Sequence, residues 1–142
     1  MNDEVLRLKN QLCFPLYACS REVIKKYKPF LDAVGLTYTQ YIAMLVLWEV
    51  KSINVKALGD QLYLDSGTLT PLLKKMELQG LVKRRRDTKD ERNVIVTITK
   101  QGEKLKEQAS EIPSKISECV SLSPDDAKML YQLLYKLLGK MC

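Results

Sequence analysis

The fold is decided by residues 62–99, LYLDSGTLTPLLKKMELQGLVKRRRDTKDERNVIVTIT. Asp65 or Ser66 can cap a helix that ends before Gly80, because short polar side chains accept hydrogen bonds from the first helical turn. After Gly80 the period changes, and LVKRRR and NVIVTIT have the character of strands, with β-branched residues concentrated in the second. The polar segment DTKDER between them predicts a turn. This stretch is therefore expected to form a helix followed by a β-hairpin.

Two further helices are expected immediately before this stretch. Residues 55–62 have the pattern of a short amphipathic helix. Thr37 can cap TYTQYIAMLVLWEV, which is apolar on nearly every side and is therefore expected at the centre of the core. Residues 55–62 and the helix after residue 65 are joined by a tight turn, which is the outline of a helix-turn-helix. Together with the hairpin, they predict a winged helix.

Helical patterns also flank the predicted winged helix. Apolar residues recur at helical spacing from about residue 14 to 33, and Gly35 can end that helix. A polar helix is expected over about 100–110, where Pro113 interrupts it. Ser123 then starts a last helix with an apolar stripe. The stripe comprises Met129, Leu130, Leu133, Leu134, Leu137 and Leu138.

This apolar stripe has no obvious groove to fill within the chain. Large exposed apolar patches are rare on monomers, so the N- and C-terminal helices are predicted to form a homodimer interface. The alternative is that the last helix folds back on its own domain. The predicted fold is mostly α with a small β-hairpin wing, in one domain of residues 1–142. A winged-helix lobe is expected over about 37–100, and dimerisation helices over about 1–34 and 101–142.

Composition narrows the classes of function. The chain has 142 residues, 46% of them hydrophobic, which suits one domain with a real core. It has neither a membrane-length apolar run nor the apolar segment of a signal peptide, so a cytoplasmic protein without membrane partners is expected. Four cysteines have spacings that suit no zinc site. Histidine is absent, which removes the commonest general base and metal ligand. We therefore expect neither an enzyme nor a cofactor or metal.

The positive charge is concentrated in the predicted winged helix. The formal net charge is +6, and the segment from Lys74 to Lys100 holds nine basic and four acidic residues, a net of +5. A basic patch on a helix-turn-helix favours double-stranded DNA as the partner. The second helix can enter the major groove, where short hydroxyl side chains permit close approach. The residues predicted to contact DNA from this pattern are Ser66, Thr68, Thr70, Lys74 and Lys75 on the helix, and Arg84, Arg86, Lys89 and Arg92 on the hairpin.

An arginine at the hairpin tip can enter a narrow, negatively polarised minor groove. Arg92 stands at that tip, and Asp90 two residues earlier is expected to orient its guanidinium by pairing with it. The hairpin is therefore predicted to act as a wing that contacts DNA beside the recognition helix.

Nearly the whole chain resembles the MarR family of dimeric winged-helix transcription regulators, most specifically in LYLDSGTLTPLLKKME and DERNVIVTITKQG. NQLCFPLYACSRE, YKPFLD and LTYTQY are similar to the organic hydroperoxide sensing, OhrR-type branch, although Pro15 departs from the aliphatic residue expected there. Related one-cysteine regulators of staphylococcal virulence share most of these motifs. The resemblance implies that Cys13 senses peroxide with support from Tyr17, Tyr27 and Tyr38. It also implies DNA contacts by Ser66, Gly67, Thr68, Thr70 and Lys75, with Asp65 bracing the helix and Arg92 as the wing arginine.

The position of Cys13 suits a sensor. Pro15 favours the first helical turn and places Cys13 at the helix entrance, where the positive end of the helix stabilises an anion such as a thiolate. Tyr17 follows one turn later and could donate a hydrogen bond to the sulfur. Fourteen helical residues span about 21 Å, so Tyr27 could reach only Cys13 of the partner subunit. Organic hydroperoxide would oxidise the thiolate to a sulfenic acid, which condenses with a second thiol.

The second thiol has several candidates. Cys19 lies about 9 Å along the same helix, beyond disulfide reach. Two-cysteine members of the OhrR type place their resolving cysteine near Cys119, so the resemblance favours a bridge from Cys13 to Cys119 of the partner subunit. A low molecular weight thiol is the alternative, and Cys142 is a minor candidate. Oxidation would shift the first helix, change the spacing of about 34 Å between the two recognition helices, and release operator DNA.

Two other functions remain open on the sequence alone. A MarR-type regulator could respond to a small aromatic or acidic ligand in the cleft between its two lobes, with Cys13 incidental. A thiol peroxidase would also use a cysteine, but no arginine or threonine arrangement that would activate a peroxide surrounds Cys13. A peroxide-sensing repressor is the favoured hypothesis.

Overall fold

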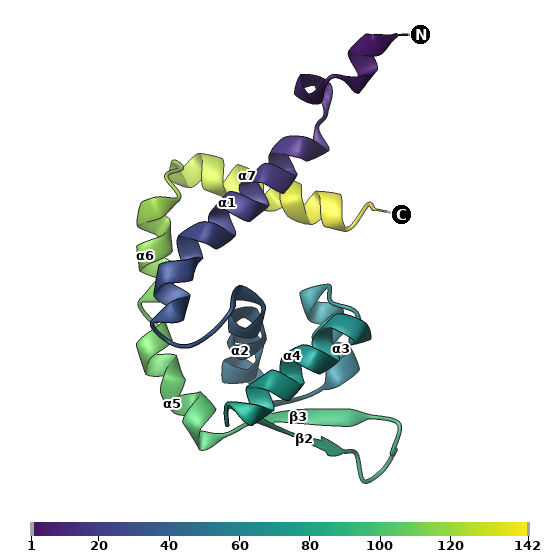
Figure 1. Cartoon of the computed structure of the whole chain (residues 1–142), viewed down its shortest axis with the longest axis vertical. Coiled ribbons are helices and arrows are strands. Elements are labelled where there is room, and N and C mark those ends of the chain that lie inside the picture. The colour runs from purple at the N-terminus through teal and green to yellow at the C-terminus, as the bar shows by residue number, and fades with distance from the viewer. Residues whose placement is uncertain (1, 142) are drawn as a thin grey trace. The chain divides into compact units, whose positions relative to one another are not determined.

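The computed structural model describes residues 2–141 (Figure 1). Two compact units divide the chain, Met1–Ile112 and Pro113–Cys142, and each is described by itself. The elements, in chain order, are η1 (Asp3–Leu6), η2 (Leu8–Asn10), α1 (Cys13–Asp32), α2 (Tyr38–Val50), β1 (Ser52–Asn54), α3 (Val55–Leu62), α4 (Ser66–Leu78), β2 (Val82–Arg86), β3 (Val94–Ile98), α5 (Lys100–Ala109), α6 (Ile112–Cys119) and α7 (Pro124–Leu138). The predicted fold class, a mostly helical winged helix-turn-helix with a small β wing, is confirmed.

Helix α2 forms the centre of the first unit, as its apolar sequence predicts. The Thr37 hydroxyl accepts a hydrogen bond from the Gln40 N–H (3.3 Å), and the Gln40 amide oxygen accepts one from the Thr37 N–H (3.1 Å). This capping box satisfies two backbone donors at the helix start. Met44 and Leu47 in the same helix are fully buried. The predicted cap and the predicted central position of this helix are both confirmed.

The helix-turn-helix also forms as predicted. Helix α3 spans Val55–Leu62, and α4 begins at Ser66 with Asp65 as its N-cap, whose Oδ1 accepts a hydrogen bond from the Thr68 N–H (2.8 Å). Leu69, Leu72, Leu73 and Met76 bury one side of α4 in the core. The other side of α4 is therefore left to solvent.

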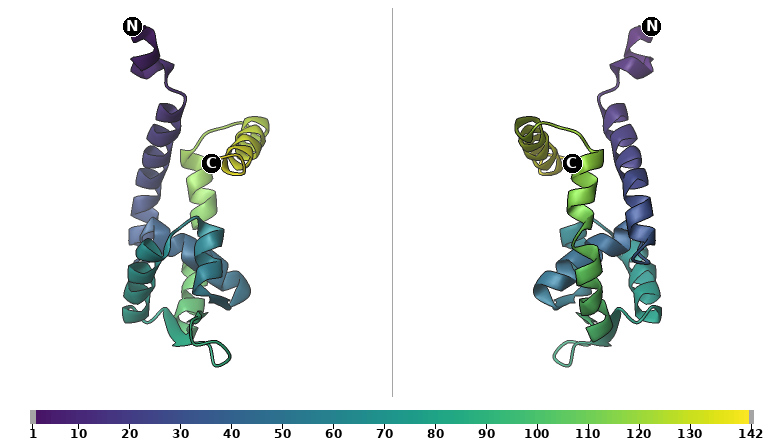
Figure 2. Two further views of the ribbon diagram at one scale, coloured as in Figure 1. Left: turned by 90° about the vertical axis from the view of Figure 1, so that its right-hand side faces the viewer. Right: turned by 90° about the vertical axis from the view of Figure 1, so that its left-hand side faces the viewer.

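The wing is larger than the predicted two-stranded hairpin. Strands β2 and β3 form antiparallel partners, and β1 adds to the free edge of β3 to give the order β1-β3-β2. Strand β1 has three residues, and Ile53, which pairs with Val96, is its only apolar side chain. A segment this short shows no alternation of apolar and polar residues, so its sequence did not predict a strand. In Figure 2 the wing lies at one end of the first unit and the N-terminal 3-10 helices lie at the other.

Helix α5 is tied to α2 by a hydrogen bond from Trp48 and approaches the backbone of Leu81 closely at Gly102. The Trp48 indole N–H donates to the Gly102 carbonyl oxygen (2.9 Å), and a Cβ at Gly102 would collide with the Leu81 carbonyl oxygen. Thr99 caps α5 as predicted, with its hydroxyl accepting from the Gly102 N–H (3.0 Å). Pro113 lies in the first turn of α6, where a missing N–H costs little, so it opens a new helix after α5 has ended.

In the second unit, Ser123 caps α7 and accepts a hydrogen bond from the Asp126 N–H (3.1 Å). The apolar stripe predicted on this helix is present: Met129, Leu130, Leu133 and Leu137 are exposed, and Leu134 and Leu138 are half-buried. No helix in the described part of the chain is both long enough and apolar enough to cross a membrane.

Candidate nucleic-acid interface and cysteine site

The start of α4 presents a row of small polar residues on its open side. Ser66, Gly67, Thr68 and Thr70 are exposed, while the Asp65 carboxylate is engaged as the N-cap. Lys74 and Lys75 follow one turn later and are exposed as well. The structure thus brings together every residue that the sequence predicted on the recognition helix. Short hydroxyl side chains in front and ammonium groups behind suit base edges and phosphates respectively.

At the wing tip, Arg92 is oriented by the predicted partner. Its Nε and Nη2 donate to the two carboxylate oxygens of Asp90 (3.0 and 3.1 Å), and its backbone N–H also donates to Asp90 Oδ1 (3.1 Å). These bonds lower the pKa of the Asp90 carboxyl below its usual value, the side-chain bond having the largest influence. The Arg92 side chain is nevertheless 90% exposed. The guanidinium is therefore preoriented while remaining available to a groove.

Arg84 corrects one prediction, because its side chain faces the interior of the lobe and only 24% of it is exposed. Its Nη2 lies 3.2 Å from Glu77 Oε1, and its backbone N–H donates to Glu77 Oε2 (2.9 Å). Glu77 belongs to α4, so this pair ties the recognition helix to strand β2. Arg84 braces the helix and wing together, and its half-buried side chain is engaged with Glu77 and is not free on the surface.

Of the other basic residues of the wing, one stabilises the turn and the rest lie on the surface. Arg86 Nη1 donates to the Glu91 carbonyl oxygen (2.9 Å), which holds the wing turn, and Lys89 at the tip is exposed. Lys83 and Arg85, which were not among the predicted DNA contacts, are exposed on the face of β2 opposite Arg84. Strand alternation could have found them, since an inward-facing Val82 places Lys83 and Arg85 outward.

The Glu77–Arg84 pair predicts a dependence of stability on acidity. Bonds from the Arg84 backbone and side chain lower the pKa of the Glu77 carboxyl below 4.5. A carboxyl with a lowered pKa contributes stability that is fully present above its unfolded value and is lost as pH falls through the lowered one. The melting temperature of wild type is therefore expected to fall more steeply than that of Glu77→Gln between about pH 5 and about pH 3. Thermal melts across this range check it, and parallel curves for the two proteins would contradict it.

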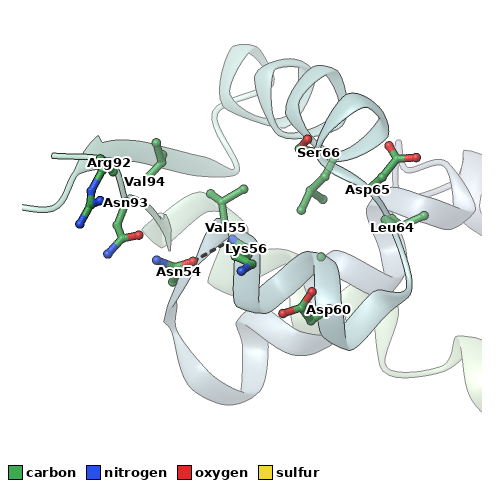
Figure 3. A pocket seen from close by; sticks show the side chains of 12 residues that line it. Asn54, Val55, Lys56, Asp60, Leu64, Asp65, Ser66, Arg92, Asn93 and Val94 are labelled. Carbon is green, nitrogen blue, oxygen red and sulfur yellow. Dashed lines mark hydrogen bonds between the residues drawn. The ribbon is translucent and has the colours of Figure 1, made fainter. Parts of the chain in front are cut away.

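The recognition helix and the wing face a common hollow of about 460 Å³. Figure 3 shows that its lining comes from three places: Asn54, Val55, Lys56 and Asp60 at α3, Leu64, Asp65 and Ser66 before and at the start of α4, and Arg92, Asn93 and Val94 at the wing. Lys56 and Arg92 contribute positive charge to this lining, and Asp60 and Asp65 contribute negative charge. The helix start and the wing arginine are thus parts of one surface.

Cys13 is the first residue of α1 and is exposed. Leu12 before it provides no side-chain cap, so the first-turn N–H groups of α1 are not satisfied by an N-cap side chain. Tyr17 lies one turn further on, and its hydroxyl accepts a hydrogen bond from Arg21 Nη1 (2.7 Å), with the guanidinium carbon 5.6 Å from the ring centroid. A phenol that accepts from Arg21 still has its own proton to donate. The role of Tyr17 beside Cys13 stays a prediction.

Tyr27, late in α1, and Tyr38, the first residue of α2, lie together. Their ring centroids are 5.0 Å apart, and Tyr41 completes a cluster at 5.9 Å from Tyr27 and 6.4 Å from Tyr38. Burial raises the pKa of all three phenols, and neighbouring tyrosines raise those of Tyr27 and Tyr41 further. The phenols therefore keep their protons and can donate to an anion. Tyr41 was missed by the sequence analysis, although it follows Tyr38 at helical spacing.

The remaining cysteines are distributed along the chain. Cys19 is exposed on α1, and Cys119 is exposed at the end of α6 in the second unit. Both thiols are accessible to a reagent in solution. Cys142 lies outside the described residues. The pairing of Cys13 with Cys119 stays a prediction.

A second hollow of about 550 Å³ lies between the end of α1 and the end of α4. Its lining is Asp32, Gly35, Leu36, Thr37, Gln40, Lys75, Leu78 and Gln79. Gln79 crosses it, donating to the Gly35 carbonyl oxygen (3.1 Å) and accepting from the Gln40 amide (3.2 Å). Among residues 2–141, no group of three or more His, Cys, Asp or Glu side chains is placed to hold a metal ion.

Two comparisons with known sequences both find transcriptional regulators. The model of the family described as transcriptional regulator SarA/Rot matches residues 25–109. The organic hydroperoxide resistance transcriptional regulator of Bacillus subtilis is 53% identical over 133 residues, which cover 94% of this chain and 90% of that protein.

Solved structures of AbfR, a protein of Staphylococcus epidermidis, are similar over almost the whole chain. AbfR bound to DNA, in its reduced and its overoxidized form, is 39% identical with a TM-score of 0.77 and covers 98% of this chain and 97 to 98% of its own. The disulfide form of AbfR is 39% identical with a TM-score of 0.66, and 97% of each chain is covered.

Proposed function

The chain belongs to the MarR family of winged-helix transcriptional regulators, in the branch that holds the Bacillus organic hydroperoxide regulator, and on that premise we propose that it is an oxidant-responsive repressor. In this proposal a homodimer binds double-stranded operator DNA in the cytoplasm while Cys13 is reduced. Organic hydroperoxide oxidises Cys13, and the dimer then releases the operator.

The observation that carries the DNA-binding part is the common surface of helix and wing. The exposed start of α4 and the preoriented Arg92 guanidinium border one hollow, so one protein face can meet a major groove and the adjacent minor groove together. The reduced, DNA-bound AbfR structure supports the same use of this fold.

The exposed apolar faces of the outer helices support a homodimer. On α1, Phe14, Leu16, Tyr17 and Ile24 are each at least 42% exposed, and the stripe of α7 is largely exposed too. Apolar surface of this extent on a single chain marks an interaction surface. A second copy would bury it and hold two recognition helices about 34 Å apart, one helical turn of DNA.

The cysteine chemistry follows from the accessible Cys13 thiol. Its thiolate attacks one oxygen of the hydroperoxide, so that an S–O bond forms, the O–O bond breaks and an alcohol leaves. A second thiol then displaces water from the sulfenic acid and gives a disulfide. Cys119 of the partner subunit is the proposed second thiol, with a low molecular weight thiol as the alternative. In the Tyr27–Tyr38–Tyr41 cluster, Tyr27 lies fourteen residues after Cys13 on α1, about 21 Å along the helix, so the cluster would serve the partner's Cys13.

The test of this function uses the full-length protein and DNA selected from a random library. Reduced protein is expected to enrich a palindromic site, and about one equivalent of cumene hydroperoxide per protomer should release it. Without a reductant, consumption of peroxide should stop at that stoichiometry, and with a dithiol it should stay far slower than consumption by a thiol peroxidase measured in parallel. Turnover as fast as that of the peroxidase, or no sequence enrichment, would overturn the proposal.

A ligand-responsive regulator is a second candidate, because the 550 Å³ hollow beside α4 could admit a small acidic or aromatic molecule near Lys75. In that case operator release would follow the ligand and would be independent of Cys13. Oxidant sensitivity that survives in Cys13→Ser would favour this candidate.

Arg92→Ala is expected to weaken operator binding by about 5- to 100-fold, mostly through AT-rich flanks, because a narrow minor groove attracts arginine most strongly there. Fluorescence anisotropy on operators with AT-rich and GC-rich flanks measures this. Arg7→Ala removes the same charge at η1, at the opposite end of the first unit, and should bind both operators like wild type. Equal losses of affinity on the AT-rich and GC-rich operators would show that Arg92 does not recognise a narrow minor groove.

A further inference from the structure

One residue of the helix-turn-helix has a backbone conformation that its side chain does not favour. Tyr63, between α3 and α4, has φ 57° and ψ 37°. This left-handed region is uncommon for residues other than glycine, asparagine and aspartate, and an aromatic residue there is strained. Such strain persists where the surroundings enforce it, and it is concentrated at functional sites.

The surrounding turn holds Tyr63 in this conformation. The N–H groups of Tyr63 and Leu64 both donate to the Gly59 carbonyl oxygen, at 2.9 Å for Leu64. A Cβ on Gly59 would lie only 2.7 Å from the Leu64 carbonyl oxygen, so α3 and the turn approach as closely as a glycine permits. Leu62 and Leu64 are half-buried on either side. The backbone of Tyr63 therefore cannot relax without opening the turn.

The Tyr63 side chain contributes little to the fold that strains it. It is 66% exposed, and within the described residues its phenol has neither a hydrogen bond nor a ring contact. Lys51, with φ 69°, is the other non-glycine residue of positive φ in residues 2–141, and it differs. Its carbonyl oxygen accepts from the Ile98 N–H (2.9 Å), and its ammonium pairs with Glu103 (3.3 Å). Among the described residues, Tyr63 alone combines a strained backbone with an unused polar group.

The place of Tyr63 in the chain indicates what its phenol can reach. It stands three residues before Ser66, beside the exposed start of α4. When the second helix of a helix-turn-helix enters the major groove, its N-terminal end faces the DNA and the flanking phosphates, and tyrosine hydroxyls are among the donors to phosphate oxygens. We propose that the Tyr63 phenol donates a hydrogen bond to an operator phosphate and thereby sets the position of α4 in the groove. This inference rests on the proposed DNA-binding function.

Tyr63→Phe removes only the phenolic oxygen and is the primary test. Operator affinity measured by anisotropy is expected to fall about tenfold or more, because a hydrogen bond to a charged acceptor is lost in each half-site. The melting temperature should stay unchanged. The slope of log affinity against log salt should also stay unchanged, since a neutral side chain displaces no counterion.

Tyr63→Gly separates stability from binding, because it relieves the strained φ and removes the phenol together. Its melting temperature should equal or exceed that of wild type by a few degrees, while its operator affinity falls at least as far as that of Tyr63→Phe. Lys51→Gly is the matched control, which relieves the other positive φ and should bind like wild type. Unchanged affinity in Tyr63→Phe, or a loss that is matched by a lower melting temperature, would overturn the phosphate contact. Failure of wild type to bind any selected DNA would overturn the proposed function with it.

Discussion

Cys13→Ser is expected to stay on operator DNA at hydroperoxide concentrations that release the wild type completely. The hydroxyl of serine occupies the same position at the start of α1 but does not form a sulfenic acid or a disulfide, so the reduced conformation has no chemical route to change. Wild-type affinity should fall at least about 100-fold on oxidation, since a dimer whose recognition helices lose their spacing keeps little more than non-specific binding. Anisotropy titrations with and without cumene hydroperoxide measure both affinities.

Substitutions of the other thiols identify the partner of Cys13. Cys19→Ser is the matched control, because Cys19 is exposed on the same helix and should leave the response unchanged. Cys119→Ser should lose the cross-linked dimer on a non-reducing gel if Cys119 resolves the sulfenic acid. A cross-link that persists without Cys119 would contradict that pairing, and release of DNA by Cys13→Ser would contradict the sensor role itself.

Local signals in the sequence were sufficient for most of the fold. The Thr37 and Asp65 caps, the 55–62 helix and the change of period after Gly80 were all predictable, because each depends on hydrogen bonds or side-chain alternation within a few residues. Strand β1 was not predictable in this way. Its three residues become a strand only because β3, forty residues later, offers a free edge. Pairing at that distance leaves no mark in a window of local sequence.

The residues of the candidate site were predicted less completely than the helices and strands of the fold. Every residue predicted on the recognition helix lies at the start or on the exposed side of α4, since one side of α4 is apolar and the other side is polar, and their contacts with DNA stay a prediction. The side-chain orientations in the run KRRR were harder to predict, because a run of like residues does not indicate which of them the strand turns inward. Strand alternation from the buried Val82 turns Arg84 inward and Arg85 outward, and Glu77 on α4 then accepts one bond from the Arg84 side chain and one from its backbone. The partner Glu77 belongs to tertiary structure, so the sequence alone did not show that the Arg84 guanidinium is engaged within the lobe.

The double substitution Thr70→Val and Lys75→Met is expected to reduce operator affinity by at least about 100-fold, since a dimer loses two base contacts of Thr70, each worth about 1 to 3 kcal/mol, together with two phosphate contacts of Lys75. Both residues are exposed on α4, and neither replacement disturbs the buried side of the helix. Valine keeps the shape of threonine without its hydroxyl, and methionine keeps the helix propensity and most of the length of lysine without its charge. The melting temperature should therefore stay close to that of wild type while binding is lost.

A matched control separates loss of specific contacts from loss of charge. Thr39→Val with Lys106→Met makes the same chemical changes on α2 and α5, away from the open side of α4, and should bind the operator nearly as wild type does. The salt dependence of operator affinity is a second measurement. Each lysine–phosphate contact that is lost lowers the slope of log affinity against log salt by about one. Affinity that falls equally in both double variants would mean that net charge, and not α4, holds the protein on DNA. Unchanged affinity in Thr70→Val and Lys75→Met would move the recognition surface away from this helix, because no other exposed helix in the described residues places hydroxyl and ammonium groups beside the wing arginine.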